Sequence, residues 1–117
     1  MTHNVSTKIR RTMTTNNDEK CQLALKDLYN VYDPEIGLNI VDLGLVYEIT
    51  FDEPGQRLDC FMTLTSQFCP MGEAITRDAS DSLSGSFPGW QVQVNLVFDP
   101  PWDVSKITPE GKEFLGY

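Results

Sequence analysis

The chain has 117 residues, enough for one domain with a modest core. Its hydrophobic share of 40% and charged share of 22% are ordinary for a soluble globular protein, and no apolar run approaches the length of a membrane span. The net charge is −8, and from Asn17 onward six basic residues stand against seventeen acidic ones, a balance that repels phosphate backbones and disfavours nucleic-acid binding. Because no charged-then-apolar secretory leader opens the chain, we expect a cytoplasmic protein.

The chain begins with a Thr- and Asn-rich stretch that contains no acidic residue. We expect residues 1–16 to be a disordered tail and residues 17–117 to form the folded domain. Asn16 or Asn17 can cap a helix that runs to about Tyr32, because acidic residues follow at once and apolar residues recur at helical spacing. That apolar stripe consists of Cys21, Ala24, Leu25 and Leu28.

Residues 33–37 end this helix, because a residue that precedes proline avoids helical angles. The sequence does not predict the structure of residues 36–44. A β-hairpin follows, with one strand over residues 45–51, a turn over residues 52–56 and a returning strand over residues 57–65. Cys60 shares one face of the second strand with apolar residues, which indicates a core thiol.

A cysteine and a proline follow this second strand. Proline is favoured in the first turn of a helix, so Pro70 is expected to be the first helical position and Cys69 its N-cap. The free amides and the positive dipole end of a helix favour a thiolate at that place. The alternative is a small residue that merely fills a turn.

The remaining elements complete a small α+β fold. A helix is predicted from Met71 to about Ser84, a third strand over residues 90–98, and a short helix over residues 108–115 with Thr108 as its cap. We therefore expect a small single-domain sandwich, in which a three-stranded mixed sheet has its helices packed mainly on one face.

Several short motifs, taken together, resemble a known family. The residues concerned are Asp33–Gly37, Ile40–Tyr47, Met62–Thr65, Cys69–Met71, Phe98–Trp102, Ile107–Glu110 and Leu115–Gly116. In this order and spacing they are similar to the signatures of the PaaD-like/SufT-type iron–sulfur cluster assembly domain family. The resemblance covers about residues 18–117. Before the cysteine the family most often has Thr-Thr-Pro-Gly, whereas this chain has Thr65-Ser66-Gln67-Phe68, so that Phe68 adds apolar surface near the thiol.

The resemblance implies a maturation factor, not an enzyme, that helps to deliver iron–sulfur clusters or iron to apo client proteins. It makes Cys69 the functional thiol and the candidate ligand for a cluster or iron, with Asp33, Glu35, Thr65 and Ser66 as the supporting site. The cargo would be bound transiently and not held tightly by the monomer. The implied partners are apo clients and other cluster-assembly proteins, with a homodimer as a further option.

The residues themselves agree with part of this picture. One soft thiolate and two carboxylates suit weak binding of iron, but one cysteine cannot supply the four ligands of a stable cluster. Asp33 and Glu35 have an alternative role in shaping a turn. Two other functions remain open: a thiol-dependent enzyme, although no second cysteine lies near Cys69 in the sequence and the only histidine is His3, or a non-catalytic protein-interaction module.

Overall fold

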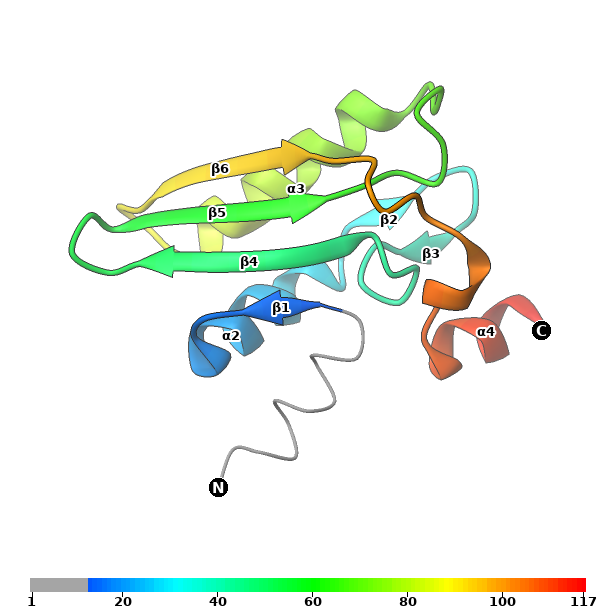
Figure 1. Cartoon of the computed structure of the whole chain (residues 1–117), viewed down its shortest axis with the longest axis horizontal. Helices are drawn as coiled ribbons and strands as arrows, with labels where there is room; N and C mark the ends of the chain where they lie inside the picture. Colours follow the sequence, from blue (N-terminus) through cyan, green and yellow to red (C-terminus); the bar gives the residue numbers. More distant parts are fainter. Residues whose placement is uncertain (1–12) are drawn as a thin grey trace.

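The computed structural model describes residues 13–117, and its centre is a four-stranded mixed sheet with the strand order β1-β4-β5-β6 (Figure 1). Strands β4 (Val46–Asp52) and β5 (Arg57–Met62) form the predicted antiparallel hairpin, in which Ile49 is the register partner of Cys60. Side chains of β5 alternate between the core and the opposite face, and Cys60 is fully buried on the core side. The hairpin and the core position of this thiol are confirmed.

The predicted helix and strand after the hairpin form a β-α-β unit. Helix α3 (Gly72–Ser86) leads from β5 to β6 (Gln91–Leu96), which pairs with β5 in parallel. Parallel neighbours need a crossover connection of this kind, because a short turn cannot return the chain to the same end of the sheet. As a result, the loop that precedes α3 lies where β5 ends.

Two helices cover one face of the sheet, as expected for this class of sandwich. Helix α2 (Asp18–Leu28) begins after Asn17, whose side-chain oxygen accepts a hydrogen bond from the amide of Lys20 at 3.0 Å. In Figure 1, α2 and α3 lie behind the strands, and the apolar faces of both helices are buried there. The apolar stripe predicted for the first helix is therefore confirmed as core.

The sheet has one strand more than the three that the sequence predicts. Strand β1 (Thr14–Thr15) pairs in parallel with β4, and Met13 is buried at 4% exposure. Residues 13–16 therefore belong to the folded domain and not to the expected tail over residues 1–16, of which residues 1–12 lie outside the part that the structure describes. A two-residue strand carries no periodicity of its own, because its pairing depends on the edge that β4 offers.

The segment that the sequence left open, residues 36–44, contains one strand of a small second sheet and the turns that follow it. Strands β2 (Tyr32–Asp33) and β3 (Leu38–Asn39) pair antiparallel. Helix α4 (Pro109–Leu115) packs against β3 at this end of the molecule; as predicted, Thr108 caps it, and Gly116 ends it in the left-handed region. The amide and the side chain of Thr108 both bond to Asp42, each at 2.9 Å, which fixes α4 to the turns after β3. Across residues 13–117, no helix combines the length and the apolar character needed to span a membrane.

Candidate functional site

Cys69 lies in the loop that connects β5 to α3, within two consecutive turns. The Cys69 amide donates to the carbonyl of Ser66 at 3.2 Å, and the Gly72 amide donates to the carbonyl of Cys69 at 3.1 Å. The Ser66 hydroxyl accepts a hydrogen bond from the Phe68 amide at 3.1 Å, which stiffens the first turn. The loop holds Cys69 at the surface, where the strand ends and the helix has not yet begun.

The predicted position of Cys69 at the N-cap is wrong. Helix α3 begins at Gly72, and its N-cap is Met71, which makes no side-chain capping hydrogen bond. Pro70 is instead the second residue of the turn that the Gly72 amide closes, and Met71 has the φ of −97° and ψ of 10° typical of the third position. The first helical amide therefore bonds to the Cys69 carbonyl and not to its sulfur, so a capping contact does not support thiolate formation.

Cys69 is nevertheless the accessible one of the three thiols. Cys21 and Cys60 are both 0% exposed, whereas Cys69 is half-buried. Burial raises the pKa of Cys21 to about 11 and that of Cys60 to about 12, from an ordinary value of 9.0. A buried thiol that keeps its proton neither binds metal nor attacks an electrophile at neutral pH. Any thiol chemistry of the folded protein therefore belongs to Cys69.

Asp33 and Glu35 lie in the turn between β2 and β3. Asp33 is only 1% exposed, and its Oδ1 accepts a hydrogen bond from the amide of Glu35 at 2.9 Å. The Asp33 carbonyl accepts further hydrogen bonds from the amides of Ile36 and Gly37. This is the turn-shaping role considered as the alternative for Asp33. Glu35 donates its amide to this turn, but its side chain is exposed and takes no part in these hydrogen bonds.

The loop of Cys69 and the β2–β3 turn lie toward the same end of the sheet (Figure 1). Both Cys69 and Ile36 pack against the same buried core. The contacts give Asp33 and Glu35 no hydrogen bond to this loop, and in residues 13–117 no three His, Cys, Asp or Glu side chains are grouped so as to hold a metal ion. Of the other expected site residues, Thr65 is half-buried and Ser66 is exposed.

Two apolar side chains beside Cys69 add to the site that the sequence motifs define. Phe68 is 82% exposed and Met71 is 37% exposed, although both are large and hydrophobic. Exposed apolar surface of this kind is available to be covered by another protein. Phe68 departs from the family pattern, and this departure indicated exposed apolar surface from the sequence. Met71 gave no such signal, because the sequence placed it in the predicted helix.

The comparisons with known proteins agree with this geometry. The family described as "Iron-sulfur cluster assembly protein" matches residues 24–96, a range that contains both the β2–β3 turn and the loop of Cys69. The chain is 41% identical to the Fe-S protein maturation auxiliary factor SufT of Staphylococcus aureus over 74% of this chain and 97% of that protein. It is 38% identical to the Fe-S protein maturation auxiliary factor YitW of Bacillus subtilis over 76% of this chain and 86% of that protein.

Solved structures with the same architecture are also known. A domain of unknown function from Bacillus anthracis superimposes with a TM-score of 0.76 at 39% identity, covering 83% of this chain and 91% of that one. A conserved hypothetical protein from Thermotoga maritima superimposes with a TM-score of 0.69 at 38% identity, covering 82% and 93%. From the extent of the family match and the level of identity over most of the chain, this protein belongs to the iron–sulfur cluster assembly protein family.

Proposed function

We propose that this chain is an auxiliary maturation factor that helps to deliver iron–sulfur clusters or iron to apo client proteins through the thiol of Cys69. The observation that carries the proposal is the accessibility of this thiol within a matched family domain, since the other two cysteines are fully buried. The named relatives are described as Fe-S protein maturation auxiliary factors, so the proposed role is that of a carrier or adaptor that works beside other assembly proteins.

The cargo is expected to bind transiently. A stable cluster takes about four protein ligands, and the part of the chain over residues 13–117 offers one accessible thiol with no grouped set of further ligands. The client protein, a small thiol or a second copy of the chain would complete the ligand set during transfer. A donor that holds its cargo weakly can release it to an apo client whose full set of cysteines binds the cargo more tightly.

The supporting residues have distinct proposed roles. Ser66 and Thr65 shape the loop that presents the thiol, and the hydroxyl of Ser66 does so through its bond to the Phe68 amide. Asp33 fixes the β2–β3 turn, and the exposed carboxylate of Glu35 offers an oxygen ligand from that end of the sheet. Phe68 supplies the apolar contact with the client.

Anaerobic reconstitution with iron and sulfide tests the role of the thiol. We expect the wild type, mixed with a small thiol, to develop an absorption band from sulfur-to-iron charge transfer, and Cys69→Ser to lose it while its thermal melting is unchanged. A band of equal intensity in Cys69→Ser would contradict the proposal.

The apolar contact has its own test, in which two exposed phenylalanines are compared. Phe68 is 82% exposed beside the thiol, and Phe114 is 68% exposed on α4. We expect Phe68→Ala to weaken the binding of an apo iron–sulfur protein about tenfold, as typical for loss of an interface anchor, and Phe114→Ala to leave it unchanged. Equal effects of the two substitutions would exclude a specific contact at Phe68.

A further inference from the structure

Strand β6 is one edge of the sheet, and its sequence leaves that edge unprotected. The strand order places β5 on one side of β6 and no strand of residues 13–117 on the other, while α3 packs behind it (Figure 1). Natural edge strands are usually very short or carry a lysine, a proline or a bulge, which discourage pairing with another chain. Strand β6 is six residues long, contains no charged residue and no proline, and pairs with β5 in an unbroken register. This edge can therefore accept a further strand.

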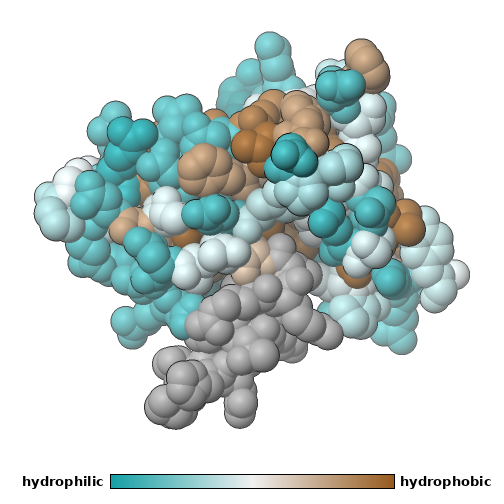
Figure 2. All heavy atoms as spheres, viewed as in Figure 1, coloured by the Kyte–Doolittle hydropathy of each residue, from teal (hydrophilic) through white to brown (hydrophobic). Residues whose placement is uncertain are grey.

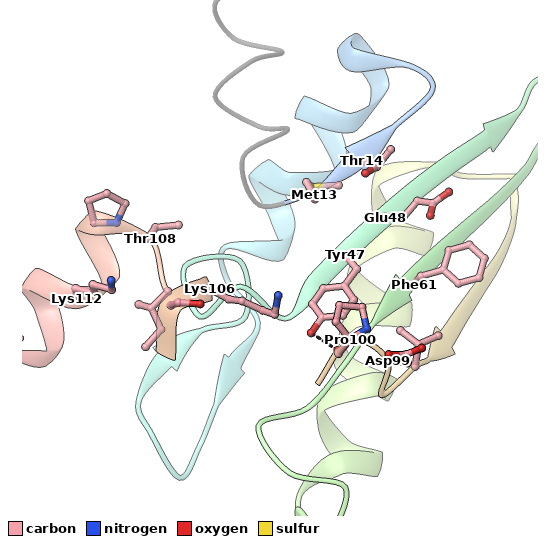
Figure 3. Close-up of a pocket in the computed structure, with 14 residues that line it drawn as sticks. Met13, Thr14, Tyr47, Glu48, Phe61, Asp99, Pro100, Lys106, Thr108 and Lys112 are labelled. Carbon is pink, nitrogen blue, oxygen red and sulfur yellow. Dashed lines mark hydrogen bonds between the residues drawn. The ribbon is translucent and has the colours of Figure 1, made fainter. Parts of the chain in front are cut away.

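The opposite edge of the sheet and its open face differ from β6. Strand β1 at the opposite edge is only two residues long, so it offers little backbone for pairing. A groove of about 800 Å³ beside β1 and β4 is lined by charged groups of both signs, among them Glu48, Asp99 and Lys106 (Figure 3). The Lys106 ammonium lies over the ring of Tyr47, 5.3 Å from its centre. Charge therefore selects no partner in that groove, whereas β6 is uncharged along its whole length.

The pairing with β5 determines which backbone groups of β6 face the edge. The amide of Gln91 donates to the carbonyl of Gln56 at 2.8 Å, and the amide of Val97 donates to the carbonyl of Met62 at 2.9 Å. Successive residues of a strand direct their amide and carbonyl to alternate sides, so the odd-numbered residues of β6 are those that bond to β5. The three even-numbered residues direct their amides and carbonyls outward: Val92, Val94 and Leu96.

The side chains of β6 are apolar on one face and polar on the other. Val92 and Val94 are half-buried against the core on the helix side, and the residues between and after them, Gln93 and Asn95, lie on the open face. The apolar side chain at the end of the strand, Leu96, is 43% exposed. Figure 2 shows an apolar patch among hydrophilic atoms over the end of β6 and the segment after it. A second strand along this edge would cover part of that exposed apolar surface.

We propose that two copies of this chain pair through β6 in antiparallel orientation, with Val94 opposite its own equivalent on a two-fold axis, so that the two sheets join into one. In this register Val92 lies opposite Leu96 of the second copy. Each of the three opposite pairs exchanges two backbone hydrogen bonds, which makes about six in all. Any other register leaves an outward-facing residue of each strand unpaired. On the open face, Gln93 lies opposite Asn95 of the second copy, and the two neutral amides can bond to each other.

Charge and symmetry select a second copy as the occupant of this edge. The net charge of −8 makes two copies repel each other over much of their surface, whereas β6 is an uncharged strip along which they can approach. A two-fold contact brings the same surface of both copies together, so that surface must be complementary to itself. Strand β6 meets this condition, because an apolar side chain faces an apolar one, an amide faces an amide, and no like charges are opposed.

Helix α3 leaves room for this pairing behind the strands. Its residues Asp78 and Ser82 line a recess together with Asp27 of α2, so this flank of α3 faces α2. Helix α2 lies away from β6 (Figure 1), and the opposite flank of α3 therefore faces the β6 edge. By helical spacing that flank carries small hydroxyl side chains: Thr76, Ser80 and Ser84. Small side chains allow the two α3 helices to approach to the distance of about 8–10 Å at which helices pack.

The pairing keeps the two thiol sites apart. The loop of Cys69 follows the end of β5, and β6 runs parallel to β5. Antiparallel pairing of two β6 strands therefore places the two Cys69 loops at opposite ends of the joined sheet. Each thiol stays accessible to its own client, and the inference is independent of the role proposed for Cys69.

Sedimentation of the full-length protein over a range of concentrations tests the proposal. We expect a reversible monomer–dimer equilibrium, which Leu96→Lys weakens about tenfold or more by placing a charge at the paired edge. Leu23→Lys is the matched control, because Leu23 is 54% exposed on α2 and the same exchange there changes the net charge equally. It should leave the equilibrium unchanged. Leu96→Pro, which removes an outward amide and none of the bonds to β5, should also weaken the dimer.

Cross-linking tests the register. Gln93→Cys and Asn95→Cys are each made in a Cys69→Ser background, which removes the accessible native thiol. In the proposed register these positions form a pair without backbone hydrogen bonds, whose Cα atoms lie about 4.5 Å apart, within the range that a disulfide spans. We expect a disulfide-linked dimer when the two variants are mixed and oxidised, and none from either variant alone.

Three outcomes would overturn the inference. A monomer at every concentration would exclude the dimer, and equal effects of Leu96→Lys and Leu23→Lys would exclude β6 as its contact. Cross-linking of either cysteine variant with itself would exclude the register centred on Val94.

Discussion

Gly44 and Gly37 offer a pair of substitutions that separates backbone conformation from close packing. Both glycines are in the left-handed region, with φ of +79° and +83°. A Cβ atom at Gly37 would meet nothing within 4 Å, whereas at Gly44 it would lie 2.1 Å from the backbone oxygen of Lys106. At either position the left-handed conformation costs an alanine about 1–2 kcal/mol of stability. Only at Gly44 must a neighbouring backbone also move, at a further cost of about 1–3 kcal/mol.

We therefore expect Gly37→Ala to lower the free energy of unfolding by about 1–2 kcal/mol and Gly44→Ala by about 2–5 kcal/mol. For a domain of this size each kcal/mol shifts the melting temperature by about 4–8 °C. Urea unfolding with an unchanged m-value measures both differences. Equal losses for the two variants would refute the reasoning, because they would mean that the approach of Lys106 to Gly44 contributes nothing to the fold.

Three further results follow from the buried and exposed groups. A limiting alkylating agent should label Cys69 first, and labelling of Cys21 or Cys60 before it would reverse the assignment of core and surface thiols. Burial raises the pKa of Cys21 to about 11 and of Cys60 to about 12. The stability due to their protonated forms is therefore complete below about pH 9, and the free energy of unfolding should fall above that pH by about 1.4 kcal/mol per pH unit and thiol. Urea unfolding that is independent of pH between about 8 and 10.5 would contradict this. Asp33→Ala removes the acceptor for the Glu35 amide and should cost about 1–3 kcal/mol, whereas Asp33→Asn keeps an oxygen there and should cost less; the reverse order would argue against the turn-shaping role.

The sequence predicted those elements whose own residues show a clear period, turn or cap. The hairpin of β4 and β5 has clear alternation and a turn of polar residues, and α4 has Thr108 at its start and Gly116 after its end. Strand β1 was not predictable in this way, because two residues show no period and the edge of β4 decides whether they pair.

The turn at Cys69 was likewise not predictable from local sequence. Pro70 favours a φ near −65° both in the first turn of a helix and in the second position of a β-turn, and the sequence alone does not distinguish the two. Here the turn prevails, because Gly72 closes it and packs closely on Leu64, whose Cδ1 would lie 2.7 Å from a Cβ atom on Gly72. The motifs located Cys69, but its turn geometry depends on the hydrogen bonds within residues 66–72 and on the packing of Gly72 against Leu64.

The proposed role of the thiol is tested most directly by the activity of an iron–sulfur enzyme in cells that lack this protein. Wild type and Cys69→Ser are expressed at equal levels, and each is checked for an unchanged melting temperature. We predict that wild type restores the enzyme activity and that Cys69→Ser does not. Full restoration by Cys69→Ser would contradict the central claim that this accessible thiol carries the function.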